Sequence, residues 1–139
     1  MMVDEVRSRT MRAVRSKDTK PELIVRRLVH SRGFRFRLHR KDLPGSPDLV
    51  FPRRRKVIFV HGCFWHGHDC ARGVRQPKTN ADYWVAKVAR NRERDRRTQQ
   101  LLFKAGWETC IIWECELKDL EVMQAKILAF LGPPAEHLR

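Results

Sequence analysis

Hydrophobic positions recur along the chain in short patterns that predict alternating strands and helices. Val57 to Val60 is a continuous apolar run, typical of a buried strand. Phe34 to Leu38 and Trp107 to Cys115 alternate in side-chain character, which favours strands with two different faces. In the second of these, the alternation places Trp107, Ile111 and Trp113 on one face and Cys110 and Ile112 on the other. A further short strand is expected over Asp48 to Phe51.

Helical signals occupy the segments around these strands. Pro21 stands in the first turn after Thr19, where proline is well tolerated, and Gly33 ends that helix. Glycines also close the two later helices, at Gly106 and Gly132. The predicted helices are, in chain order, Thr10 to Asp18, Thr19 to Arg32, Asn80 to Ala105 and about Leu117 to Leu131.

This order of elements predicts an α/β fold with a small central sheet and helices packed on it. The chain has 139 residues and neither repeats nor a linker, so a single domain over residues 1–139 is expected. Residues 1–20 form a basic N-terminal arm of that domain.

The charge of the chain indicates the kind of partner that it binds. Thirty Lys and Arg residues against sixteen Asp and Glu give a net charge of +14 and a sequence pI near 10.7. Such a surplus favours binding to nucleic acid over binding to an anionic membrane surface. No apolar run is long enough for a membrane span, and the N-terminus has no secretory signal. An intracellular protein is therefore expected, whose cysteines are thiols or metal ligands.

Cysteine and histidine side chains gather just after the Val57 to Val60 strand. Cys63, His68 and Cys70 form the pattern C-x4-H-x-C, and Cys115 follows 45 residues after Cys70. Three thiolates and one imidazole are a ligand set for a tetrahedral zinc ion. The alternative is that cysteines serve as small buried hydrophobic residues, and this reading is preferred for Cys110.

Two further histidines, His61 and His66, are not needed for zinc. Each could be an ordinary hydrogen-bonded structural histidine. Asp48, at the start of the neighbouring predicted strand, suggests another interpretation. A carboxylate that holds Mg2+ and an imidazole that activates water are what phosphodiester hydrolysis requires.

Longer motifs join these residues. They are Pro44-Gly45-Ser46-Pro47-Asp48, Val57 to His66, Lys87 with Asn91, Arg94, Asp95 and Arg97, Gly106-Trp107, and Trp113-Glu114-Cys115. In order and spacing, from about Thr10 to Cys115, the chain resembles the very short patch repair (Vsr) endonucleases. This resemblance implies a restriction-endonuclease-like three-layer core of the PD-(D/E)XK superfamily. It also implies nicking of DNA beside the thymine of a T·G mismatch left by deamination of 5-methylcytosine.

The resemblance implies a role for each matched residue. Asp48 would ligate the catalytic Mg2+, and Val60 would add its backbone carbonyl. His61, in place of the superfamily lysine, would orient metal-bound water, and His66 would activate the attacking water. Glu22 matches a glutamate near a second metal ion and the leaving group.

Other matched residues belong to the zinc site and to DNA binding. The structural zinc ligands would be Cys63, His68, Cys70 and Cys115. The aromatic residues that wedge between base pairs at the mismatch would be Phe64, Trp65 and Trp84. The matched DNA-binding residues on the long helix are Lys87, Asn91 and Arg94.

The chain departs from the family and superfamily patterns at a few positions. Phe59 stands where the superfamily has a second acidic ligand, as in Vsr proteins. Gly67 and Asp69 replace histidines of a richer run in many relatives, and Val60 stands where relatives can have Thr. Mg2+ binding is therefore expected to depend heavily on Asp48.

The sequence thus predicts a strand-specific mismatch endonuclease that uses Mg2+ for catalysis and Zn2+ for structure. Its expected partners are double-stranded DNA with a T·G mismatch and other mismatch-repair proteins. A monomer in the bacterial cytoplasm, associated with the nucleoid, is expected. Two alternatives remain: a related restriction-modification nuclease without mismatch specificity, and a non-catalytic zinc-stabilised DNA-binding module.

Overall fold

The structure, a computed structural model, describes residues 19–64, 66–70 and 80–133, so the predicted helix over Thr10 to Asp18 lies outside the described residues. The described elements are α2 (Lys20–Ser31), β1 (Arg37–Leu38), β2 (Leu49–Phe51), β3 (Lys56–His61), α3 (Ala81–Lys104), β4 (Glu108–Trp113), the 3-10 helix η1 (Glu114–Lys118) and α4 (Leu120–Leu131). The α/β class predicted from the sequence is confirmed.

The four strands form one mixed sheet in the order β1-β2-β3-β4. β1 and β2, and β2 and β3, are antiparallel, with Leu49 opposite Ile58. β3 and β4 are parallel, with His61 opposite Trp113, and the long helix α3 connects them. A parallel pair needs such a crossover, because its strands enter the sheet from the same end.

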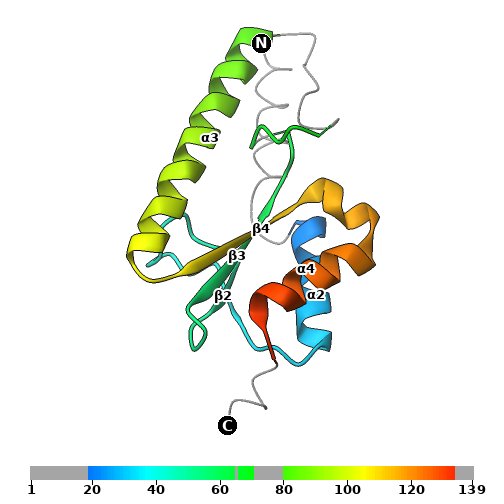
Figure 1. The fold of residues 1–139 in the computed structure, drawn as a ribbon. Coiled ribbons are helices and arrows are strands. Elements are labelled where there is room, and N and C mark those ends of the chain that lie inside the picture. The colour runs from blue at the N-terminus through cyan, green and yellow to red at the C-terminus, as the bar shows by residue number, and fades with distance from the viewer. Residues whose placement is uncertain (1–18, 65, 71–79, 134–139) are drawn as a thin grey trace.

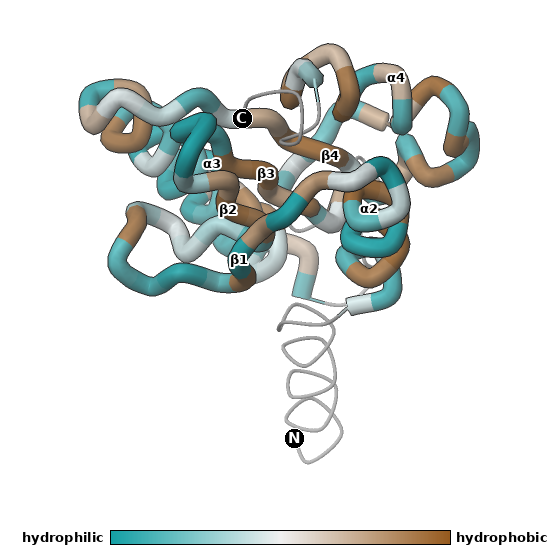
Figure 2. The backbone as a smooth tube through the Cα atoms, turned by 90° about the horizontal axis from the view of Figure 1, so that it is seen from below, coloured by the Kyte–Doolittle hydropathy of each residue, from teal (hydrophilic) through white to brown (hydrophobic). Residues whose placement is uncertain are grey.

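Helices cover both faces of the sheet, so the molecule has three layers (Figure 1). On one face, residues of α2 and α4, such as Val25 and Ile127, pack with Ile58 and Ile112 of the sheet. On the other face, Leu102 of α3 packs with strand residues and Trp107. In Figure 2 the strands β2, β3 and β4 are mostly apolar, while the visible turns of α3 are mostly polar. The sheet therefore supplies the apolar centre of both packed interfaces.

The predicted two-faced strand is confirmed in its pattern. Cys110 and Ile112 lie in the core with α2 and α4, whereas Trp107 and Ile111 pack on the α3 side. This alternation follows from the period of two in a strand. Trp113 lies on the same strand face as Ile111, and its ring contacts the rings of His61 and His68.

Helices α2 and α3 begin and end close to the predicted residues. Thr19 is the N-cap of α2, and its hydroxyl oxygen accepts a hydrogen bond from the Glu22 N–H at 3.4 Å. Asn80 is the N-cap of α3, whose last residue, Lys104, is followed by Ala105 and Gly106. Gly106 has a φ of 87°, a conformation that favours glycine after a helix.

Three boundaries differ from the prediction. β1 contains only Arg37–Leu38, because Phe34 is buried and its N–H still bonds the Val29 carbonyl of α2. β4 ends at Trp113, where the Glu116 side chain accepts the Trp113 N–H at 2.9 Å as η1 begins. Cys115 therefore lies in a 3-10 helix rather than at a strand end.

The last helix begins later than predicted. Asp119 is the N-cap of α4 and accepts the Val122 N–H at 3.2 Å, so the first residues of the predicted helix belong to η1 instead. None of the described helices is both long enough and apolar enough to cross a membrane.

Candidate functional site

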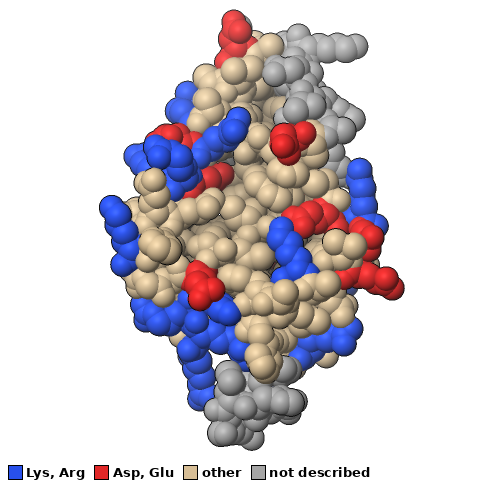
Figure 3. All heavy atoms as spheres, in the orientation of Figure 1, with Lys and Arg blue, Asp and Glu red and all other residues tan. Residues whose placement is uncertain are grey.

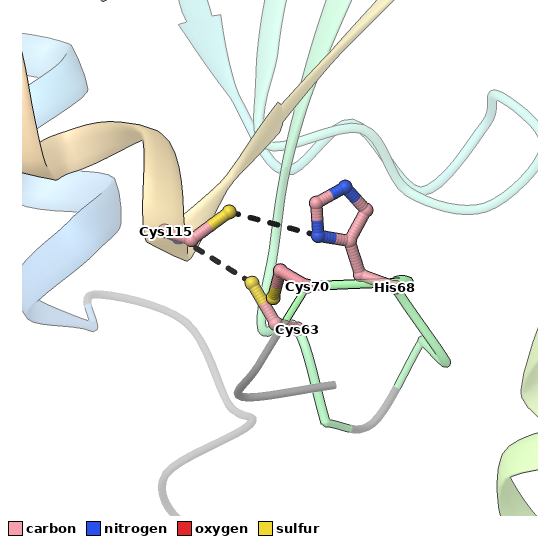
Figure 4. Close-up of side chains that lie close together, drawn as sticks. All are labelled: Cys63, His68, Cys70 and Cys115. Atoms are coloured by element: carbon pink, nitrogen blue, oxygen red, sulfur yellow. Dashed lines mark hydrogen bonds between the residues drawn. The ribbon is translucent and has the colours of Figure 1, made fainter. Parts of the chain in front are cut away.

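Four thiol and imidazole side chains converge between the β3–α3 loop and η1 (Figure 4). We call Cys63, His68, Cys70 and Cys115 the cysteine cluster. One possible ligand atom from each lies within 4.8 Å of all the others. The Cys115 N–H points to the Cys63 sulfur at 3.4 Å, and the Cys115 sulfur lies 3.6 Å from Nδ1 of His68. The structure therefore brings together all four predicted zinc ligands.

The spacing of these atoms fits a tetrahedral metal ion. Zinc with bonds of about 2.3 Å to sulfur and 2.0–2.1 Å to nitrogen places sulfur and nitrogen about 3.6 Å apart. Burial and the adjacent sulfurs raise the pKa of the Cys63 thiol to about 12, and burial also raises the pKa of Cys115. A bound metal cation would instead lower these pKa values, because it binds cysteines as thiolates. The cluster is thus a candidate metal centre with a closed shell.

A second group, the carboxylate cluster, consists of Glu22, His39 and Asp48. Nε2 of His39 lies 2.8 Å from Oε2 of Glu22, and its Nδ1 lies 3.9 Å from Oδ1 of Asp48. Arg26, one turn along α2, also pairs with Oε2 of Glu22. Glu22 is 2% exposed, so this ion pair is held in a nearly dry environment.

Asp48 is tied to the end of β3 through the main chain. Its Oδ2 accepts the Val60 N–H at 2.7 Å. Burial, together with the nearby Glu22 carboxylate, raises the pKa of Asp48 to about 7, against the smaller effects of the Val60 hydrogen bond and Arg26. Two carboxyl groups packed this closely form a set of hard oxygen ligands of the kind that Mg2+ prefers.

The third group, the histidine cluster, consists of His61, His66 and Asp95. The rings of His61 and His66 stack with centroids 3.7 Å apart, and Nδ1 of His66 lies 2.6 Å from Oδ2 of Asp95. Burial, and secondarily the neighbouring His66, lowers the pKa of His61 to about 3. His61 therefore stays uncharged across the physiological pH range.

The histidine cluster opens into a pocket of about 580 Å³ between α3 and β4. The pocket is lined by His61, His66, Gly67, His68, Asp69, Arg92, Asp95, Arg96, Gln99, Gln100, Phe103, Ile111 and Trp113. Two arginines and two glutamines on one wall provide donors for an anionic or hydrogen-bonding ligand. The imidazoles are thus placed beside a space that a ligand can enter.

The four predicted catalytic side chains do not form one group. Glu22 and Asp48 lie together, His61 and His66 lie together, and Val60 links the two, since its N–H holds Asp48 and the next residue is His61. Asp48 precedes β2 and turns its carboxylate to the β3 main chain beside α2, whereas His61 is the last residue of β3.

Sequence reasoning missed two members of these clusters. His39 is a single histidine in a charged segment, Arg37 to Asp42, and no spacing connects it to Glu22 or Asp48. Asp95 stood in a matched motif but received no role. The signal that could have found it is helical: α3 carries Asp95 toward the loop that holds His66.

The predicted aromatic residues are placed unequally. The Phe64 ring is half-buried and packs edge-on against Trp84 with centroids 6.3 Å apart. Trp84 is 8% exposed, so in this conformation it supports Phe64 instead of facing solvent. Trp65 lies outside the described residues. The exposed aromatic ring beside them is Tyr83, which had not been predicted as a site residue.

The predicted DNA-binding residues of α3 also differ in exposure. Arg94 is exposed, and Lys87 is half-buried with its ammonium 5.9 Å from the Tyr83 ring centre. Asn91 is 3% exposed and faces the interior. Figure 3 shows Lys and Arg side chains spread over one face of the molecule with acidic side chains among them, rather than gathered into one patch.

The chain is similar to several known proteins. The family model described as "DNA mismatch endonuclease Vsr" matches residues 1–72. Type II nicking enzyme V.XorIIP of Xanthomonas oryzae pv. oryzae is 54% identical over 129 residues, which cover 93% of this chain and 94% of that protein. DNA mismatch endonuclease Vsr of Escherichia coli K12 is 41% identical over 88% of this chain and 78% of its own. Type II nicking enzyme V.NmeAIP of Neisseria meningitidis serogroup A is 41% identical, over 87% and 86%.

Proposed function

Because the chain belongs to the family of the DNA mismatch endonuclease Vsr, we propose that it nicks one strand of DNA beside the thymine of a T·G mismatch. As a member of this family it is a DNA endonuclease, and DNA is its substrate. This sets aside the alternative of a non-catalytic DNA-binding module. The mismatched base pair, the use of Mg2+ and the roles of single residues are the proposed parts.

The observation that carries the proposal is the contact between His66 and Asp95. Asp95 accepts the Nδ1–H of His66, which leaves Nε2 of His66 unprotonated in the neutral ring. An imidazole held in this tautomer can take a proton from an attacking water near neutral pH. The open pocket beside it supports access for a phosphodiester group.

His61 complements His66 as a neutral partner. Its pKa is lowered to about 3, so it remains a neutral hydrogen-bonding group when His66 gains a proton. Its buried Nδ1 makes no hydrogen bond to any residue that the structure describes. We propose that this atom orients the attacking water, because a buried polar atom without a described protein partner fits a site for solvent or substrate.

Asp48 and the Val60 carbonyl would hold the catalytic Mg2+, and Glu22 would lie near a second metal ion and the leaving group. These donors fit hard cations, since they are oxygen atoms and include two carboxylates. When bound, Mg2+ would polarise the phosphate and stabilise the leaving oxyanion. Val60 is suited to its part, because its N–H already fixes Asp48 at the end of β3.

The cysteine cluster would hold a structural zinc ion through Cys63, His68, Cys70 and Cys115. All four candidate ligands come from the protein, so no position is left for substrate. The zinc would fasten the loop that carries His66 to η1, since Cys115 belongs to η1 and the other three residues to the loop.

Mismatch recognition is assigned to Phe64, Trp65 and Trp84. Inserting a ring into a base stack costs a few kcal/mol of unstacking, and the cost is smallest at a mispaired step. Since Phe64 rests on the buried Trp84, we propose that Trp84 acts by supporting the inserted ring. Exposed Arg94 and half-buried Lys87 would contact phosphates, and buried Asn91 would position α3 from within.

The remaining parts of the proposal concern architecture and setting. The three layers are compatible with a restriction-endonuclease-like core, and the whole chain would act as one domain and as a monomer. Bacterial relatives in DNA repair favour the cytoplasm, where the protein would associate with DNA and with other mismatch-repair proteins.

A strand-resolved nicking assay tests the proposal. Duplexes that differ only in one pair, T·G, T·A or C·G, are incubated with and without Mg2+, with each strand carrying its own label. We expect nicks in the thymine strand of the T·G duplex alone, and only with Mg2+. Equal nicking of the T·A or C·G duplex would instead support a restriction-modification nuclease without mismatch specificity, which the type II nicking enzymes among the relatives make the second candidate.

A further inference from the structure

We propose that His39 is a nitrogen ligand of the catalytic metal ion, beside Asp48, and that Glu22 orients it. The inference rests on the proposed function, since it adds a residue to the metal site that this function requires. His39 lies between β1 and β2, and its possible ligand atom is within 4.8 Å of those of Glu22 and Asp48. No motif of the sequence includes His39.

One oxygen of each carboxylate has a defined protein partner. Oδ2 of Asp48 accepts the Val60 N–H at 2.7 Å. Oε2 of Glu22 is the oxygen that meets both Arg26 and Nε2 of His39. Oδ1 of Asp48 is therefore the oxygen of that carboxylate turned toward the imidazole, at 3.9 Å from Nδ1.

Nε2 of His39 has two polar neighbours: Oε2 of Glu22 at 2.8 Å, which can accept its proton, and the Arg26 guanidinium at 3.0 Å, which can only donate. In the proposed tautomer, Nε2 carries the proton and donates it to the nearer Glu22 oxygen. In the neutral ring this leaves a lone pair on Nδ1, on the side of Asp48. Metal-binding histidines nearly always donate their other N–H to a carboxylate or a carbonyl, and Glu22 provides that carboxylate here.

The distance between Nδ1 of His39 and Oδ1 of Asp48 agrees with a shared cation. At 3.9 Å it is too long for a hydrogen bond. Two ligand atoms that each lie about 2.1 Å from one ion are separated by about 3.0 Å at a right angle and about 4.2 Å in a straight line. The observed 3.9 Å lies between these two values, so a small movement of the His39 ring toward Asp48 would complete a right-angled pair.

The backbone holds His39 in this position. Its φ is 50°, in the left-handed region that few residues other than glycine adopt. Its N–H donates to the Asp48 carbonyl at 3.3 Å, which places the two residues side by side at the end of the β1–β2 pair. Such a strained conformation is kept where the surrounding structure requires it, often at functional sites.

An imidazole ligand changes the preferred metal. Mg2+ favours oxygen ligands, whereas Mn2+ and Co2+ accept imidazole nitrogen readily. Removal of the His39 ring should therefore weaken Mn2+ binding more than Mg2+ binding. A histidine that merely pairs with Glu22 would leave no nitrogen on the ion and no difference between the two metals.

The test measures Mn2+ bound to the full chain loaded with one equivalent of zinc, using electron paramagnetic resonance. Pulsed spectra should show coupling of Mn2+ to an imidazole ¹⁴N in the wild type. In His39→Gln this coupling should disappear, Mn2+ affinity should fall by about 10-fold or more and Mg2+ affinity by less than about 3-fold. His30→Gln, at an exposed position of α2, is the matched control and should behave as the wild type.

Three outcomes would overturn the proposal: no ¹⁴N coupling in the wild type, coupling retained in His39→Gln, or coupling lost in His66→Gln instead. If His39→Gln does not fold, as judged by circular dichroism, His39→Asn takes its place. The nicking assay on T·G and T·A duplexes is read separately. If the wild type nicks T·G and T·A duplexes equally but shows the ¹⁴N coupling, the proposed function is contradicted and the ligand assignment stands.

Discussion

The cysteine cluster and the carboxylate cluster are both candidate metal sites, yet they differ in what they do to the fold. The cysteine cluster surrounds one point with four soft ligands from two separate segments, so a metal there joins the loop to η1. The carboxylate cluster buries two acids close together, and burial raises the pKa of Asp48 to about 7. Filling the first site would stabilise the protein, whereas the second buries two acids, of which Glu22 is paired with Arg26 and Asp48 would be offset by a bound cation or a proton.

The largest expected effect separates activity from stability at the carboxylate cluster. Asp48→Asn should lower the nicking rate by at least about 10³-fold, because the main acidic ligand is lost. Zinc content should stay at the wild-type level. A variant that nicks at near the wild-type rate would remove Asp48 from the proposed site.

The same variant should be more stable than the wild type in Mg2+-free buffer at pH 8. The folded-state pKa of Asp48 is above its unfolded value of 3.8, so its contribution to stability is complete below about pH 4 and is lost as pH rises through about 7. Asn has no such loss, and the gain at pH 8 should be about 1–3 kcal/mol. Melting temperatures at pH 4 and pH 8 measure it; an equal difference at both values would contradict the pKa argument.

The cysteine cluster should respond in the opposite way. Cys115→Ser should release zinc and lower the free energy of unfolding by about 3 kcal/mol or more, because the loop loses its link to η1. Cys110→Ser is the matched control: it places a hydroxyl in an apolar strand at a cost of about 1–2 kcal/mol and retains zinc. Metal analysis measures the zinc content, and thermal melts measure the loss of stability. Equal zinc loss in both variants would mean that the fourth ligand is wrongly assigned.

A smaller effect is expected in the histidine cluster, which supplies no ligand to either proposed metal site. Asp95→Asn should lower the nicking rate by about 10²-fold while zinc content and DNA affinity change little, because His66 loses the acceptor that fixes its tautomer. Glu93→Gln, an exposed acid of the same helix, is the control and should nick normally. Single-turnover rates on a T·G duplex measure both, and similar rates for the two variants would argue against a role for Asp95.

The contrast also explains what the sequence could predict. The cysteine cluster was predictable because three of its ligands lie within eight residues. The fourth, Cys115, is a cysteine, and cysteine is a rare residue in this chain. The ends of α2 and α3 were predictable because Thr19, Pro21 and Gly106 act locally. The position of Cys115 in η1 was not, since it depends on the Glu116 side chain turning back to the Trp113 N–H.

The carboxylate and histidine clusters depend on contacts between distant residues. His39 lies 17 residues from Glu22, and its place is set by the end of the β1–β2 pair. The separation of Asp48 from His61 depends on the Asp48 carboxylate turning to the Val60 N–H just before β2, which the order of motifs does not reveal. The burial of Trp84 and Asn91 was likewise not visible in the sequence pattern of the long helix.

Helix α3 lies along the β3–α3 loop and contacts it at several points. Trp84 contacts Phe64 near one end, Val88 and Arg92 leave room at Gly67 only for a hydrogen, and Asp95 reaches His66. Trp84 and Asp95 are 11 residues apart, which is about three turns and 16 Å on one side of a stiff rod. If Phe64 meets the mismatch as proposed, a displacement of its ring by DNA would move α3 and the His66 imidazole together, so that recognition and bond cleavage would share one rigid element.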